Sequence, residues 1–153
     1  MAEFFDAAGS LAAFCSESTQ PESEVATFIH TIVRLFSLLN ASALEHLTDT
    51  VALREVGFET IDAMGLDSDT SYVLESPFGK RNKSMLLFQW IQCLMVKGLA
   101  QGIIAVPAPI CARAFQNLAD GMAKFHDAQK VAKIPFPFPY VGGFQMGLAS
   151  NAV

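Results

Sequence analysis

Apolar residues recur along most of the chain at helical spacing. Between residues 23 and 47 they follow steps of three and four, which predicts a long helix with Ser23 as its cap. Its apolar stripe is wider than one face, so we expect neighbours to cover this helix on most sides. Further helices are predicted over residues 3–15, from a cap at Asn82 or Ser84 to about residue 100, and from about 108 to 132. No stretch has strand-like alternation, so we expect an all-α fold, a bundle of about four longer helices.

The region between residues 48 and 83 interrupts this pattern. It is rich in acidic residues and contains glycines and a proline, which predicts short helices joined by solvated turns. We place these short helices near Glu59–Met64 and Ser68–Leu74. The whole chain, residues 1–153, is expected to be one domain, with a helical body at 1–133 and an extended Pro/Gly tail at 134–153.

The tail begins with a stretch in which prolines alternate with large apolar residues, Ile134–Tyr140. Each proline fixes φ, lacks an N–H and keeps the preceding residue out of the helical region, so the stretch must be extended. We call it the proline strap. Such a strap suits docking on an apolar surface or leading the chain into one. The residues expected to dock on a membrane or partner are Pro135, Phe136, Pro137, Phe138, Pro139 and Tyr140.

The amino-acid composition indicates that much of the surface must be apolar. Hydrophobic residues make up 52% of the chain and charged residues 16%, against roughly 25% in a typical domain. Part of the surface is therefore expected to face a membrane or another protein, although an Ala-rich bundle with a large core is the alternative. No apolar helix without interruption reaches the roughly 20 residues of a membrane span. The net charge of −5 and the lack of a basic run exclude a nucleic-acid partner.

Candidate chemistry is sparse. The three cysteines, Cys15, Cys93 and Cys111, lie in apolar segments and are expected to be buried, reduced thiols. His30 is expected to be a core or near-core group, and no two histidines have metal-ligand spacing on one helix. Asp67–Ser71 resembles the start of a calcium loop, but the glycine and glutamate that should follow are absent. We therefore expect no catalytic residues, no cofactor and no metal, and a protein that is not an enzyme.

A set of segments in a fixed order carries a resemblance to a known family. It comprises Val33–Leu44, Gly57–Asp62, Gly65–Asp67, Gln89–Gln92, Pro107–Gln116 and Ile134–Tyr140. From about Phe4 to Tyr140 the chain resembles the bestrophin family of anion channels, in the form found in algae. In that family these elements form the extramembrane helical region between the second and third membrane helices.

The resemblance implies a pentamer of same-type membrane protein subunits that passes chloride and bicarbonate. The strap would lead into the third membrane helix. The segment from Pro107 resembles the family's lower constriction, and Ile110 is the residue that matches it. A ring of such apolar side chains would gate the pore by its size and by dewetting. The implied location is the extramembrane face of a membrane, on the stromal side of the plastid thylakoid.

The family's membrane helices, its main pore neck and its acidic calcium clasp have no counterpart in this chain. Two interpretations follow. The chain is part of a longer anion channel, or the domain is an accessory structural subunit docked on unlike subunits of a larger membrane complex, such as a photosynthetic one.

Overall fold

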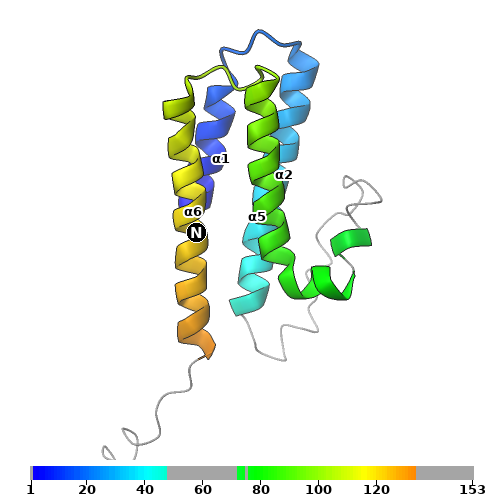
Figure 1. Cartoon of the computed structure of the whole chain (residues 1–153), viewed down its shortest axis with the longest axis vertical. Coiled ribbons are helices and arrows are strands. Elements are labelled where there is room, and N and C mark those ends of the chain that lie inside the picture. The colour runs from blue at the N-terminus through cyan, green and yellow to red at the C-terminus, as the bar shows by residue number, and fades with distance from the viewer. Residues whose placement is uncertain (1, 48–71, 75, 134–153) are drawn as a thin grey trace, which may run out of the picture.

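The computed structural model describes residues 2–47, 72–74 and 76–133. Four longer helices account for most of these residues: α1 (Ala2–Phe14), α2 (Glu22–Leu47), α5 (Pro77–Ala100) and α6 (Ala108–Lys133), with one helical turn at 72–74 (Figure 1). The described residues contain no strand, so the predicted all-α fold is confirmed. The expected helix near Glu59–Met64 and the tail at 134–153 lie outside the described residues.

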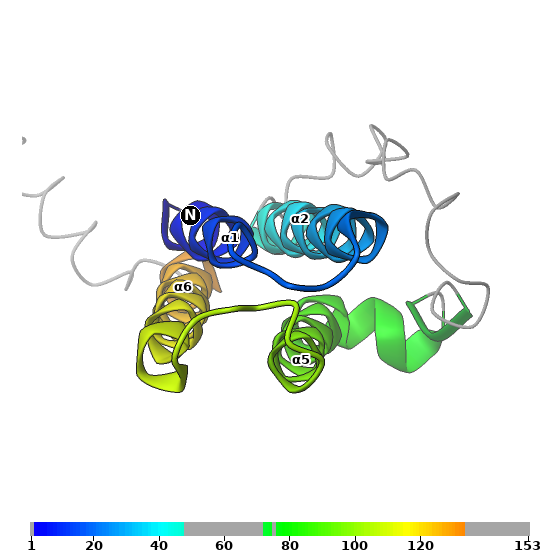
Figure 2. The ribbon, with the colours of Figure 1, turned by 90° about the horizontal axis from the view of Figure 1, so that it is seen from above.

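The helices are arranged as two closely packed pairs. Helix α1 lies along α6, and α2 lies along α5, while α1 and α2 join the two pairs. Seen from above, α5 and α6 stand apart from each other, and they make at most marginal contact (Figure 2). The bundle is therefore closed on three sides and open between α5 and α6.

The core takes its side chains from one face of each helix. Its fully buried larger members are Phe4 and Leu11 of α1, Ile32 and Leu39 of α2, Leu87, Ile91 and Met95 of α5, and Leu118 of α6. The spacing of three or four residues within each helix is what the sequence predicted. Burying each such side chain stabilises the fold by about 1.5–3 kcal/mol, which makes this face the main source of stability.

Two glycines allow helices to approach each other closely. A Cβ at Gly98 of α5 would lie 2.7 Å from the ring of Phe28, and one at Gly121 of α6 would lie 2.4 Å from the ring of Phe4. Each aromatic ring fills the space that a side chain at the glycine would need. Glycine therefore sets the distance between the helices of each pair.

Helix α5 begins earlier than the sequence indicated. The Ser76 hydroxyl accepts a hydrogen bond from the Gly79 N–H at 3.0 Å, and Pro77 occupies the first turn, so Ser76 is the cap. Asn82 instead lies inside the helix with φ −119° and ψ 24°, which bends it. Ser84 is buried, and its hydroxyl forms a 2.9 Å hydrogen bond with the hydroxyl of Ser42 in α2. The helix predicted to start at Asn82 or Ser84 is thus preceded by a further helical stretch that begins at Pro77, and the two stretches meet at the kink at Asn82.

At one end of the bundle, hydrogen bonds join the loop that follows α1 to the loop that follows α5. The Ala105 N–H donates to the Phe14 carbonyl at 3.1 Å, and the Ser18 hydroxyl donates to the Gly102 carbonyl at 3.2 Å. Gly102 adopts a φ of 72°, a left-handed conformation that ends α5. These contacts fix where α6 begins relative to the end of α1.

Helix α2 is less covered than expected. In its most apolar stretch of 18 residues only 39% of the residues are buried, and Val33 and Leu44 are 45% and 40% exposed. The expectation that neighbours cover this helix on most sides was therefore wrong. By length and composition, α2 is also apolar enough to cross a membrane. The expectation that no helix of the chain reaches that length was wrong too. This is weak evidence for membrane association, because core helices pass the same test.

Candidate functional site

Ile110 lies in the first turn of α6, at the end of the bundle where the loops after α1 and α5 meet. Its N–H donates to the Pro107 carbonyl at 2.9 Å, so the rigid Pro107 turn holds this residue in place. Its side chain is 49% exposed, whereas the next residue, Cys111, is buried. Further along α6 the buried apolar residues are Cys111, Ala114, Leu118, Met122 and Phe125. Ile110 is therefore available to a neighbour.

The opposite end of the bundle carries a group of exposed apolar side chains. Helix α2 ends there, α5 begins there and α6 ends there (Figure 1). The large apolar residues toward this end of the three helices are Leu44, Met85 and Val131, which are 40%, 52% and 78% exposed, and the ion pairs Lys83–Glu45 and Lys130–Asp127 lie on the same helix ends. We call this the apolar end. Exposed apolar groups gathered from three helices are typical of a surface that meets a partner.

The chain leaves α6 at the apolar end, after Lys133. The docking residues predicted from the sequence follow directly, and all of them lie outside the described residues: Pro135, Phe136, Pro137, Phe138, Pro139 and Tyr140.

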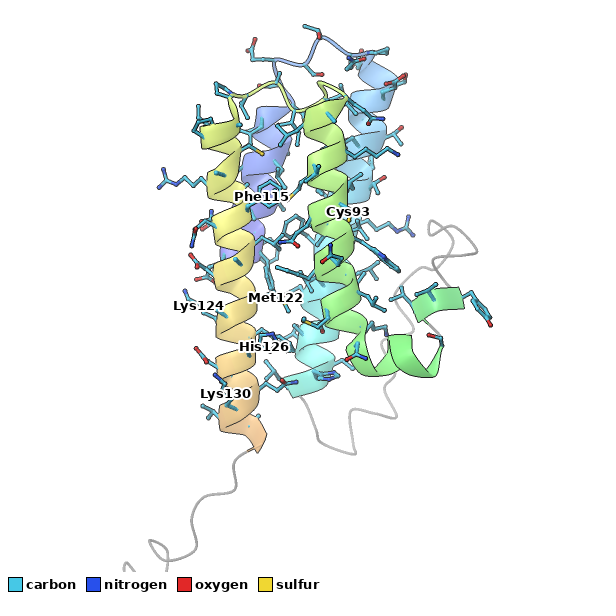
Figure 3. All side chains as sticks on the ribbon, viewed as in Figure 1. Cys93, Phe115, Met122, Lys124, His126 and Lys130 are labelled. Atoms are coloured by element: carbon cyan, nitrogen blue, oxygen red, sulfur yellow. The ribbon has the colours of Figure 1, made fainter. Side chains whose placement is uncertain are left out.

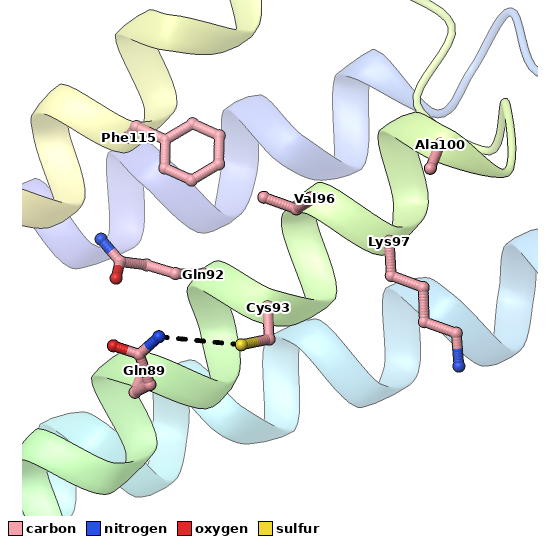
Figure 4. A pocket seen from close by; sticks show the side chains of 7 residues that line it. All are labelled: Gln89, Gln92, Cys93, Val96, Lys97, Ala100 and Phe115. Atoms are coloured by element: carbon pink, nitrogen blue, oxygen red, sulfur yellow. Dashed lines mark hydrogen bonds between the residues drawn. The ribbon is translucent and has the colours of Figure 1, made fainter.

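A groove of about 540 Å³ lies between α5 and α6 (Figure 4). We call it the α5–α6 groove. It is lined by Gln89, Gln92, Cys93, Val96, Lys97, Ala100 and Phe115. The Gln89 side-chain N–H lies 3.8 Å from the Cys93 sulfur. Sequence reasoning missed this groove because it depends on the separation of α5 and α6, which helical periodicity does not encode.

A smaller groove of about 350 Å³ lies between α2 and α5. Lys97 lines it as well, opposite the Thr27 and Thr31 hydroxyls. Both hydroxyls donate to backbone carbonyls of their own helix, at 2.7 and 2.8 Å. The lining of this groove also contains Ser23, Glu24 and Gln101, so it mixes hydroxyl, carboxylate and amide groups with one cation.

The cysteines divide into two classes. Cys15 and Cys111 are buried, and burial raises the pKa of both thiols, which leaves them protonated and unreactive. Cys93 is exposed in the α5–α6 groove, so the expectation that all three are buried was wrong. Its segment is apolar, but Cys93 lies on a face of α5 that none of the other described helices covers.

Two of the three histidines, His46 and His126, lie near the same aromatic ring, that of Phe125. His30 is exposed, so its expected place in the core was wrong. His46 and His126 are half-buried, and their ring centroids lie 6.4 and 5.4 Å from that of Phe125. Within the described ranges no group of three His, Cys, Asp or Glu side chains could hold a metal ion. The calcium-loop-like stretch at 67–71 lies outside them.

One ion pair links α1 to α6. Lys124 donates to the Glu3 carboxylate, and this hydrogen bond lowers the pKa of Glu3 from 4.5 to about 2. The same contact raises the pKa of Lys124. Both side chains are on the surface, so the pair orients α1 rather than forming a reactive site.

Comparison with known proteins found no matching protein family, no matching curated protein and no matching solved structure.

Proposed function

We propose that the chain is the extramembrane helical domain of a bestrophin-like chloride and bicarbonate channel, and that it is not a catalyst. The observation that carries the proposal is the apolar end. Exposed Leu44, Met85 and Val131 come from three different helices there, and α6 passes the chain to the proline strap at the same place. An end of this kind suits contact with membrane-embedded protein or lipid.

The position of Ile110 supports the same proposal. A helix rises 1.5 Å per residue, so Ile110 lies roughly 35 Å along α6 from Lys133. In a channel with the apolar end at the membrane, Ile110 would stand at the far mouth of the extramembrane pore. Its partly exposed aliphatic side chain suits a hydrophobic constriction shared by several copies.

The alternative is an accessory structural subunit of a larger membrane complex, as in photosynthetic membranes. Exposed Phe5 and Val33 favour it, because they lie on α1 and α2, away from α6 and Ile110. Apolar groups on this second side suit contact with unlike neighbours, which would surround a single copy.

Cross-linking between copies tests the proposal. In a chain with Cys93→Ser, a cysteine introduced by Ile110→Cys should join copies through a short bismaleimide after isolation from membranes. Ala112→Cys, two residues along α6 and also exposed, is the matched control and should cross-link much less.

Subunit counting of the same particles completes the test. Several copies per particle, with cross-links specific to position 110, support the channel domain. A single copy bound to unlike subunits, with no cross-link at either position, contradicts it and supports the accessory subunit.

A further inference from the structure

The lining of the α5–α6 groove carries a single charge. Lys97 supplies an ammonium group, and the lining contains no Asp or Glu. Lys97 is exposed and makes no ion pair with another side chain that the structure describes, although Glu24 lines the neighbouring groove between α2 and α5. The α5–α6 groove is therefore complementary in charge to an anion.

The opposite wall of the groove is apolar. Phe115 lies on the side of α6 that faces α5, whereas Lys124 points away from it (Figure 3). The Phe115 ring and the Val96 side chain are directed toward each other across the gap between the two helices (Figure 4). Val96 is 57% exposed, Ala100 is exposed and Phe115 is half-buried. A hydrocarbon group placed between Val96 and Phe115 would remove this apolar surface from water.

The remaining lining residues are suited to a small polar head group. Gln89 and Gln92 carry amide N–H donors, and the Gln89 amide nitrogen lies 3.8 Å from the Cys93 sulfur, which is a weak acceptor. The groove volume of about 540 Å³ falls within the roughly 300–1,000 Å³ of small-molecule sites. Such sites combine apolar walls with a few polar groups that fix the orientation of the ligand.

We propose that the α5–α6 groove binds a monocarboxylate with an apolar body, of the class of medium-chain fatty acids. The carboxylate pairs with Lys97, and the hydrocarbon chain lies between Val96 and Phe115. Lys97 extends from α5 on the side away from Phe115, so the ligand crosses the exposed face of α5 (Figure 4). One carboxylate balances the one ammonium group, whereas a phosphate monoester would bring a second negative charge that no cation of the lining meets. The proposal goes beyond the proposed function, because neither a pore nor a docking end requires a soluble ligand.

Cys93 reports whether the groove is occupied, because it lines the groove and is exposed. With octanoate as the ligand and neutral iodoacetamide as the alkylating reagent, the Cys93 rate of the full chain should fall about tenfold when nine-tenths of the grooves are occupied. Octanol has the same chain length without the charge and is the matched control ligand. It should need an about threefold higher concentration for half protection, as expected for the loss of one exposed charge pair.

Three variants separate the charged head from the apolar chain. Lys97→Gln should raise the half-protecting concentration of octanoate about threefold and leave that of octanol unchanged. Lys130→Gln removes a lysine of α6 outside the lining and should change neither value. Val96→Ser removes apolar surface and should raise both values. Each variant is compared with its own rate without ligand, so a change in the reactivity of the thiol itself does not enter.

Three outcomes overturn the proposal. Equal protection by octanoate and octanol, unchanged in Lys97→Gln, would show that the groove does not recognise a carboxylate. Protection that grows with protein concentration and not with octanoate would assign the groove to a second copy of the chain. Buried Cys15 and Cys111 remain unreactive while the bundle is folded. If Cys93 changes its rate only where these two thiols also react, octanoate loosens the bundle as a detergent does and has no site in the groove.

Discussion

The contact between Gly121 and Phe4 gives the sharpest test of the packing between α1 and α6. A Cβ added by Gly121→Ala would lie 2.4 Å from a ring carbon of Phe4, whose side chain is only 2% exposed. Overpacking of this kind costs about 1–3 kcal/mol. Alanine in place of glycine inside a helix gains about 1 kcal/mol. We therefore expect a net loss of about 1 kcal/mol.

Gly9 of α1 is the matched control. It also lies inside a helix, but a Cβ at Gly9 would meet nothing within 4 Å. Gly9→Ala should therefore keep the whole helical gain and stabilise the fold by about 1 kcal/mol. The two substitutions are chemically identical, so their difference of about 2 kcal/mol isolates the contact with Phe4.

A double-mutant cycle tests the cause. Phe4→Leu removes the ring, so Gly121→Ala in that background should become neutral or stabilising, with a coupling of about 2 kcal/mol. Urea unfolding followed by far-ultraviolet circular dichroism measures each free energy. The reasoning is refuted if Gly121→Ala stabilises the wild-type chain as much as Gly9→Ala does.

Three further predictions concern buried and ionised groups. Ser42→Ala should cost about 1–3 kcal/mol in urea unfolding because it leaves the buried Ser84 hydroxyl unpaired, whereas Ser42→Ala/Ser84→Ala should be nearly neutral; equal losses would contradict this. The lowered pKa of Glu3 favours folding above pH 4.5, and this contribution is lost as the pH falls from 4.5 to about 2. Glu3→Gln should therefore flatten the pH dependence of the unfolding free energy between pH 5 and 3, and an unchanged slope would argue against the pair. Ellman's reagent should modify Cys93 before Cys15 and Cys111, because burial raises the pKa of the latter two; the reverse order would contradict the burial.

Local rules predicted the helices well. Spacing of apolar residues located all four, and α1 at Ala2–Phe14 differs by one residue at each end from the predicted 3–15. The sequence missed the helical stretch that Ser76 and Pro77 start before the kink at Asn82. It also placed a cap at Ser23, which lies inside α2 because that helix begins at Glu22. Cap chemistry therefore explains the start of α5 but did not locate the start of α2.

Tertiary arrangement was the part that could not be predicted. Apolar neighbours in the sequence suggested that His30 and Cys93 are buried, but in the part of the chain that the structure describes both side chains are exposed. Periodicity shows that a helix has an apolar side without showing which neighbours it receives. The α5–α6 groove depends on the same information, and so did the exposure of Ile110.

The pairing of α1 with α6 has a consequence for synthesis on the ribosome. Roughly 90 residues separate the end of α1 from the start of α6. At translation rates of about 5–20 residues per second, α1 waits roughly 5–20 s for its partner. During that delay Phe4 and Leu11 have no α6 to cover them, so the nascent chain is a natural client for chaperones that hold exposed hydrophobic segments.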